Sequence, residues 1–351
     1  LPGLILPEVE LSFANSLRIN CSAQVVFRRP LESAAGQNQT VRCGLTLLDI
    51  APQDHVTLIG LLHQVRDENA YICNAVDLNA LWDFFFETGF IYPTKYAFIE
   101  QNKHQIKDTY HRLYSQSPNI ARHFIYQDKG VILGHMAMVR FYEDAWLIHH
   151  HAARRHALNK AGLVVLDQIG RFSYDAYRLY SMHMNYLICY YRPDNKFPSR
   201  VFGGLAAHIN NLRGCSLDPF AFLQVNQPKR PLRPLPRGWE LSPSNLTDLE
   251  ELTDFYDEAS GGLALHALDL EVGAWNSTTL TEEYGSHGFT RGKHHFSLHY
   301  NGRLTAFFMV TVSDIGLNLS DLTNCIKVFI LDQAAVSPDR IYEVLSTLRI
   351  Q

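Results

Sequence analysis

Three consecutive histidines, His149, His150 and His151, are the residues of this chain whose type and spacing best suit chemistry. They end an apolar run that begins at Ala145, so we expect them at the end of a strand. Alternation would send His150 to one face and His149 and His151 to the other. An imidazole, with a pKa of about 6.5, can take a proton from an ammonium group before the amine attacks. The run predicts a general base, His150 before the other two, with a structural strand end as the alternative.

A metal site is not expected at these histidines. Two imidazoles one residue apart on opposite faces cannot chelate the same ion, and a site would need a third or fourth ligand.

A basic segment follows the histidines and could bind an anion. It contains Arg154, Arg155, Asn159, Lys160 and Gly162 before a predicted helix. The amino end of a helix offers unpaired N–H groups and about half a positive charge, which favours phosphates. Gly162 would allow the backbone to approach them closely. We therefore expect these five residues to bind a phosphate-bearing cofactor, with a structural loop and a solvated basic face as the alternative.

The elements that must position these residues alternate between helix and strand. Asp77 can cap a helix, and a second amphipathic helix carries Ile106, Tyr110, Leu113 and Tyr114 on one face. Strands are predicted at 122–127, 131–140, 145–152, 185–191 and 217–225, and helices at about 160–180 and 198–210.

A pattern that occurs twice predicts a duplicated unit. His123-Phe124 and His295-Phe296 each start an apolar run, and each is followed seven residues later by a turn glycine, Gly130 or Gly302. Lys129-Gly130 and Asn301-Gly302 then lead into a second apolar run, which is typical of a β-hairpin. Asn245 caps a helix before the second copy, a strand is expected at 323–331 after it, and Pro338 starts a last helix.

This order of elements resembles the GNAT (N-acyltransferase) fold in residues 70–225, and residues 239–351 resemble a second, truncated GNAT-like unit. The resemblance implies acyl-CoA as cofactor, held at the segment around Arg154, and a small-molecule or protein amine as acceptor. The family's loop, (Q/R)-x-x-G-x-(G/A), differs in spacing from this segment. The family commonly places a proton-donating Tyr after the fifth strand, where this chain has Phe202. The second copy is expected to be non-catalytic.

Residues 1–66 read as three strands and a helix opened by Pro52. Leu1-Pro2-Gly3, Val9 to Phe13 and Arg42 to Leu45 resemble the C-terminal half of a PilZ domain, a barrel that binds cyclic-di-GMP. The family's R-x-x-x-R and (D/N)-x-S-x-x-G motifs are not in the chain and would precede Leu1. Cyclic-di-GMP binding is therefore expected only of a longer chain, and both ends of this one are expected to be truncated.

Composition places the chain among ordinary globular proteins. It has 351 residues, 46% hydrophobic and 19% charged, with a net charge of -4, which gives no long-range attraction to a nucleic acid duplex. No apolar run approaches the roughly 20 residues needed to span a membrane. Six scattered cysteines predict reduced, mostly buried thiols in a cytoplasmic protein. Residues 226–238, rich in Pro and basic residues, predict a stiff linker between domains.

Taken together, the sequence predicts an α+β protein: a partial PilZ-like barrel at 1–66, GNAT-like mixed-sheet units at 70–225 and 239–351, and the linker between them. The predicted function is that of a bacterial signalling protein linked to cyclic-di-GMP, whose GNAT-like output transfers an acyl group from acyl-CoA to an amine. The alternative is a non-catalytic degenerate GNAT-fold scaffold that binds a protein partner or a small ligand.

Overall fold

The chain forms two compact units in a computed structural model. The structure describes residues 1–13, 17–31, 41–72, 77–155, 161–223 and 234–348. Unit 1 comprises Leu1–Arg140 and Asp144–Leu187, and unit 2 comprises Phe141–Glu143 and Ile188–Gln351. The four segments predicted from the sequence are finer than this division and remain predictions; most of the linker segment, 226–233, lies outside the described residues.

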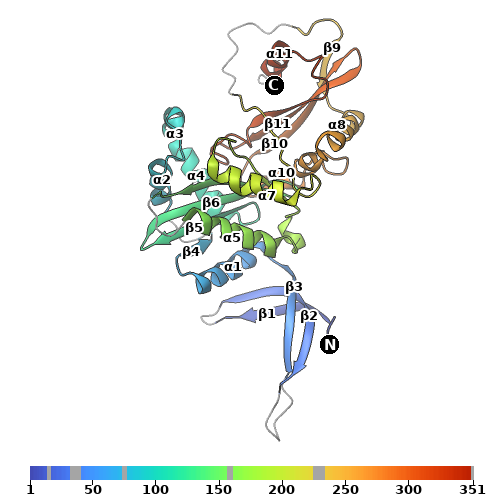
Figure 1. Cartoon of the computed structure of the whole chain (residues 1–351). Helices are drawn as coiled ribbons and strands as arrows, with labels where there is room; N and C mark the ends of the chain where they lie inside the picture. Colours follow the sequence, from blue (N-terminus) through green and yellow to red (C-terminus); the bar gives the residue numbers. More distant parts are fainter. Residues whose placement is uncertain (14–16, 32–40, 73–76, 156–160, 224–233, 349–351) are drawn as a thin grey trace. The chain divides into compact units, whose positions relative to one another are not determined.

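Unit 1 begins with an antiparallel sheet in the order β1-β2-β3, followed by α1 (Figure 1). The bounds are β1 Ile5–Ser12, β2 Arg18–Pro30, β3 Val41–Ile50 and α1 Pro52–Arg66. Alternate residues of β2, from Ile19 to Val25, are buried, as expected of a strand with one covered face. Within the described chain this sheet stays open, so the three strands do not form the closed barrel of a PilZ domain.

The rest of unit 1 is a five-stranded sheet in the order β4-β5-β6-β7-β8 with helices on both faces (Figure 1). Its strands are β4 Ala70–Ile72, β5 Ala121–Asp128, β6 Val131–Tyr142, β7 Ala145–Ala153 and β8 Tyr186–Cys189. Its helices are α2 Leu78–Glu87, η2 Pro93–Lys95, α3 Tyr96–Gln101, α4 Lys103–Gln116, α5 Ala161–Ala176 and η3 Tyr180–Met182. Asp77 caps α2 by accepting from Asn79 N, as predicted.

Unit 2 is built on a four-stranded sheet in the order β12-β11-β10-β9. Its strands are β9 Trp239–Pro243, β10 Arg291–Tyr300, β11 Arg303–Ser313 and β12 Cys325–Ile330. Its helices are α6 Lys196–Pro198, η4 Ser199–Gly203, α7 Gly204–Ile209, α8 Leu246–Ser260, α9 Leu263–Ala267, α10 Thr279–Ser286 and α11 Pro338–Leu348.

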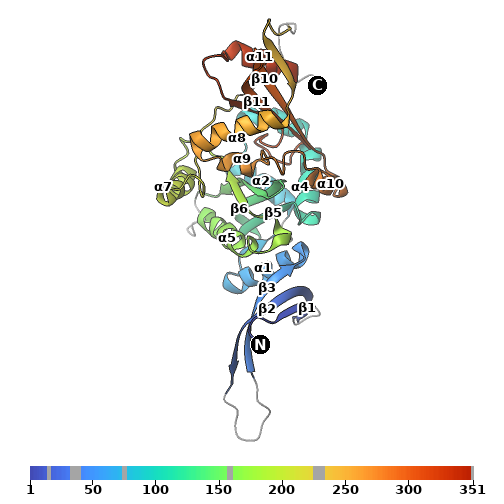
Figure 2. The ribbon, with the colours of Figure 1, turned by 90° about the vertical axis from the view of Figure 1, so that its right-hand side faces the viewer.

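Two helices cover the two faces of this second sheet (Figure 2). α11 packs Val344 and Leu348 against Leu298, Ala306 and Phe308. The next residue of β10, His299, points the other way and donates from Nε2 to Asp248 Oδ1 of α8 at 2.8 Å.

The predicted repeat is confirmed by backbone geometry. Lys129 and Asn301 have φ of 49° each, and the glycines after them have φ of 79° and 78°. In both hairpins the register shifts after the third residue beyond the histidine, at Tyr126/Gln127 and at Leu298/His299. Both copies therefore use the same left-handed turn and the same bulge.

Two expectations are corrected. No strand is present at the described residues 217–223, where Pro219 has no N–H to donate. Cys43 is exposed, and Cys189, Cys215 and Cys325 are half-buried, so of the described cysteines only Cys21 is buried.

The α+β class is confirmed. Among the described helices, none combines the length and the apolar character needed to cross a membrane.

Candidate functional site

β7 carries the three predicted histidines, but its alternation is broken at His150. His150 has φ 53°, in the left-handed region, which turns its side chain to the same face as that of His149. The two ring centroids are 3.9 Å apart. His151 faces the other way, and its Nε2 donates to Gly162 O of α5 at 3.2 Å. The prediction that His149 and His151 share a face is therefore wrong.

Two tyrosines of α4 contact these histidines. Tyr110 and Tyr114 are one helical turn apart and lie on the buried face of α4. The Tyr114 hydroxyl lies 3.2 Å from His149 Nε2, and the Tyr110 hydroxyl hydrogen-bonds His150 Nδ1. The two hydroxyls also hydrogen-bond each other. His149, Tyr114, Tyr110 and His150 thus form one hydrogen-bonded chain, which we call the His–Tyr chain.

His135 of β6 holds the backbone of His150, which is one end of this chain. Its Nδ1 donates to the His150 carbonyl at 2.9 Å, which holds the left-handed residue in place. The ring is fully buried and meets the edge of Phe85 at a centroid distance of 5.0 Å. Because Nδ1 carries the proton, the neutral ring has an acceptor at Nε2, and this atom has no hydrogen-bond partner among the described residues.

Burial keeps the histidines of this site uncharged. It lowers the pKa of His149 to about 3, and it lowers the pKa values of His150 and His135 well below the ordinary value. Neighbouring histidines lower the latter two further. Burial also raises the pKa of Tyr110, so its hydroxyl keeps its proton. His149, His150 and Tyr110 are therefore uncharged near pH 7, and hydrogen bonds connect them through the Tyr114 hydroxyl.

The end of β7 meets the start of α5 at a junction of small residues. A Cβ on Gly134 of β6 would lie 2.9 Å from Ala161 O, and one on Gly162 would lie 3.3 Å from Ala153 Cβ. Glycine at these two positions therefore lets α5 begin directly against the sheet.

The predicted cofactor-binding residues fall into three groups. Arg154 is held within unit 1: its N–H donates to Leu133 O, its Nε donates to Ile132 O at 2.8 Å, and its Nη1 lies 2.5 Å from Glu87 Oε2. Arg155 is exposed, and Gly162 is in the first turn of α5. Asn159 and Lys160 lie outside the described residues.

Sequence reasoning did not identify Tyr110, Tyr114 and His135 as site residues. Tyr110 and Tyr114 were assigned to an apolar helix face, where tyrosine is an ordinary packing residue. A signal was available: two hydroxyls at i and i+4 on a buried face must find partners.

The described part of the chain has no group of three His, Cys, Asp or Glu side chains placed to bind a metal ion. Two tyrosines that follow β8, where a proton donor would be expected, pack among aromatic rings. Tyr190 meets Phe220 edge-on at 5.3 Å, and Tyr191 lies 6.2 Å from Phe202. Burial raises the pKa of Tyr190, so it carries a proton at neutral pH.

No family model and no curated protein matches this chain. Solved structures do show similarity. A probable acetyltransferase is 11% identical at a TM-score of 0.30, over 48% of this chain and 97% of its own. Glucosamine-6-phosphate N-acetyltransferase from Arabidopsis thaliana is 13% identical at a TM-score of 0.29, over 44% of this chain and 97% of its own. A tandem GNAT protein from the clavulanic acid biosynthesis pathway is 9% identical at a TM-score of 0.20, over 54% of this chain and 58% of its own. Values this low leave function to be inferred from the chain's own residues.

Proposed function

We propose that unit 1 binds an acyl-CoA at the junction of β7 and α5 and transfers its acyl group to an amine. The observation that carries the proposal is the left-handed residue His150. It gathers two neutral imidazoles on one face of the strand whose next residues lead into α5. The strand β7 therefore carries the proton acceptors and also precedes α5, whose amino end attracts phosphate.

In the proposed reaction the amine nitrogen attacks the thioester carbonyl, the C–N bond forms and the C–S bond breaks. The nitrogen loses one proton and the departing thiolate gains one. The His–Tyr chain would take the amine proton: Tyr110 accepts it as it passes its own to His150 Nδ1. His149 and His151 are the other candidate bases on the strand. Backbone N–H groups would stabilise the oxyanion, and Arg155 would bind the pyrophosphate.

Calorimetric titration of the full chain with acetyl-CoA, succinyl-CoA and a long-chain acyl-CoA tests the binding step. We expect at least one of them to bind, and Arg155→Ala to weaken that binding roughly tenfold or more through loss of a charged contact. Arg66→Ala, an exposed arginine of α1, is the matched control. Absence of binding by every acyl-CoA would exclude the proposal.

A second candidate function is a GNAT-like scaffold that binds without catalysis. It is favoured by Phe202, which has no proton to give to a departing thiolate. A turnover assay distinguishes the two functions. Release of free CoA thiol in the presence of a panel of amines supports the transferase, whereas tight acyl-CoA binding with no thiol release for any amine supports the scaffold.

A further inference from the structure

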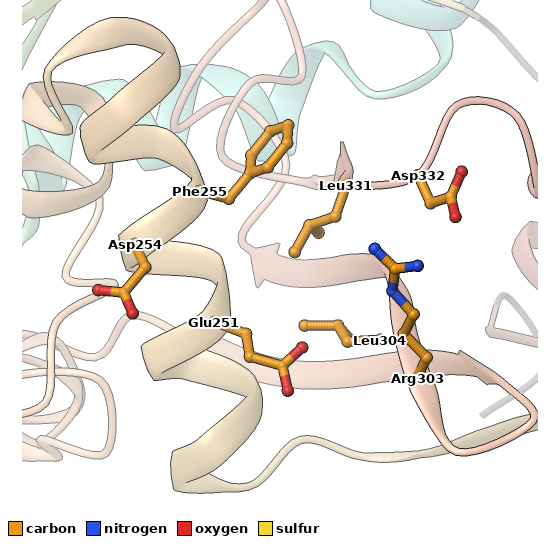
Figure 3. A pocket seen from close by; sticks show the side chains of 7 residues that line it. All are labelled: Glu251, Asp254, Phe255, Arg303, Leu304, Leu331 and Asp332. Carbon is orange, nitrogen blue, oxygen red and sulfur yellow. The ribbon is translucent and has the colours of Figure 1, made fainter.

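Unit 2 contains an open hollow of about 240 Å³ between α8, the start of β11 and the segment after β12 (Figure 3). Its walls carry both signs of charge above an apolar floor. The lining residues are Glu251, Asp254, Phe255, Arg303, Leu304, Leu331 and Asp332. No part of the function proposed for unit 1 uses these residues.

The internal repeat shows which place in unit 1 corresponds to this hollow. Leu331 N donates to Thr305 O at 2.9 Å, just as Arg154 N donates to Leu133 O at 2.9 Å. Thr305 and Leu133 are 172 residues apart, as are His295 and His123 in the two hairpins. Leu331 therefore occupies the position of Arg154.

In unit 1 this position holds a guanidinium group. The Arg154 side chain extends along the sheet to Glu87 and lies 5.8 Å from the ring of Phe84, both on α2. α2 is the helix after β4, the strand that pairs with β5. In unit 2, α8 is likewise the helix after β9, which pairs with β10. Unit 1 thus shows that a cation between this helix and the strand end is stabilised by a carboxylate and an aromatic face.

In unit 2 the corresponding helix retains these features while the strand end does not supply the cation. α8 presents the carboxylate of Glu251 and the ring of Phe255 to the hollow, and Asp254 lines its edge with the carboxylate turned outward (Figure 3). Leucine at position 331 is shorter than arginine and uncharged, so it leaves the space open. The Glu251 carboxylate, which faces this space, has no cation from the strand end to pair with.

An anion-binding group lies on the opposite wall. Arg303 is exposed, and among the described residues no carboxylate lies within ion-pair distance of its guanidinium. The neighbouring Asp332 already accepts from the N–H groups of Ala334 and Ala335 through Oδ1, at 3.1 Å each. Leu304 and Leu331 lie between the two charged walls (Figure 3).

We propose that this hollow binds a small zwitterion with a guanidinium end, of which free arginine is the simplest example. The guanidinium would lie against Glu251 and Phe255, in the position that Arg154 occupies in unit 1. The methylene groups would cover Leu304 and Leu331, and the carboxylate would pair with Arg303. The volume suits a ligand smaller than a drug-sized molecule. Unit 2 is then a binding module for such a metabolite.

Calorimetric titration of the full chain with three probes tests the proposal. Arginine should bind, agmatine lacks the carboxylate, and norvaline lacks the guanidinium, so each of the last two should bind roughly ten to a hundred times more weakly. Glu251→Gln should weaken arginine and agmatine but not norvaline. Arg303→Gln should weaken arginine and norvaline but not agmatine. Glu258→Gln, on the same helix outside the hollow, is the matched control.

Leu331→Arg is the most direct variant, because it should place the chain's own guanidinium in the hollow, as in unit 1, and abolish arginine binding. The Glu251→Gln result keeps the proposal testable if this variant does not fold. Failure of arginine to bind the wild-type chain overturns the proposal. So does agmatine binding as tightly as arginine, or arginine binding that is unchanged in both Glu251→Gln and Leu331→Arg. Since no acyl-CoA is involved, these results are independent of the function proposed for unit 1.

Discussion

At the scale of single residues, burial of uncharged imidazoles makes the stability of unit 1 depend on pH. In the unfolded chain His149 has the ordinary pKa of about 6.5, whereas in the folded chain burial lowers its pKa to about 3. Between these values the unfolded state binds more protons. The stability that His149 contributes is therefore complete above about pH 6.5 and is lost as the pH falls towards 3.

This difference predicts the effect of His149→Gln. Glutamine can still hydrogen-bond Tyr114 but cannot be protonated. The wild-type chain should lose about 2 kcal/mol more of its unfolding free energy than the variant between pH 7 and pH 5. Urea unfolding at the two pH values measures this. His111→Gln, on the exposed side of α4, is the control. Parallel losses in wild type and His149→Gln would contradict the buried, neutral state of the ring.

Arg154 and Arg155, which follow β7, should contribute differently to the free energy of unfolding. Arg154→Ala removes the ion pair with Glu87 and the hydrogen bond to Ile132 O, and should cost about 1 kcal/mol after allowance for partial exposure. Arg155 is exposed, so Arg155→Ala should change the free energy of unfolding by less than about 0.5 kcal/mol. Guanidinium denaturation of both variants checks this, and equal losses would refute the different roles of the two arginines.

At the scale of elements, two glycines of unit 1 differ in the space around them. Gly134 of β6 faces Ala161 O, where a Cβ would come within 2.9 Å of a backbone atom. Gly134→Ala should push α5 away from the sheet and cost about 1 to 3 kcal/mol. Gly170 lies within α5 with open space around it. Gly170→Ala should therefore raise the free energy of unfolding by roughly 0.5 to 1 kcal/mol, because alanine has the higher helix propensity. Thermal unfolding of both variants is the measurement, and stabilisation by Gly134→Ala would contradict the close contact.

The same elements show how much could be predicted from sequence. Helix caps and hairpins depend on local chemistry, so Asp77, Asn245 and the two turn glycines identified them correctly. The left-handed conformation of His150 could not be predicted, because it depends on a hydrogen bond from His135, a residue of another strand. The predicted repeat alone did not indicate the hollow in unit 2. Finding it requires the correspondence between Leu331 and Arg154, and this correspondence depends on strand register.

The short helix α9 of unit 2 is not predicted from the sequence either. α9 starts directly after Gly261 and Gly262, which have φ of 79° and 71°. Such a pair predicts a turn, and nothing in the local sequence indicates that a helix of five residues follows it.

At the scale of the whole molecule, the chain is a duplication whose copies have diverged at corresponding places. His123 and His295 occupy the same position, and each ring centroid lies 5.7 Å from that of a residue in the facing strand, His135 in one copy and Phe307 in the other. One copy has therefore kept an imidazole where the other has a phenyl ring. Together with the exchange of Arg154 for Leu331, this favours a chemical role for unit 1 and a binding role for unit 2.

The division into units is not sequential, and this leads to a last prediction. Phe141–Glu143 belongs to unit 2, where Glu143 Oε1 accepts from Ser277 Oγ at 2.8 Å and from Leu280 N at 3.1 Å. Glu143→Ala should destabilise unit 2 by about 1 to 3 kcal/mol, because it leaves two donors without their acceptor. The next residue, Asp144, belongs to unit 1, and its half-exposed side chain makes a single 3.3 Å contact with His183, so Asp144→Ala should cost less than about 1 kcal/mol and only in unit 1.

Native-state hydrogen exchange resolves the two units in one experiment, because it reports the opening free energy of each amide. In Glu143→Ala, protection should fall across β10 and β11 and stay at the wild-type level across β5 and β6. If both sheets lose protection equally, the two units unfold as one and the boundary at Glu143 is wrong. If neither changes, the Glu143 carboxylate does not stabilise unit 2, and its segment should be assigned to unit 1 with the strands that flank it.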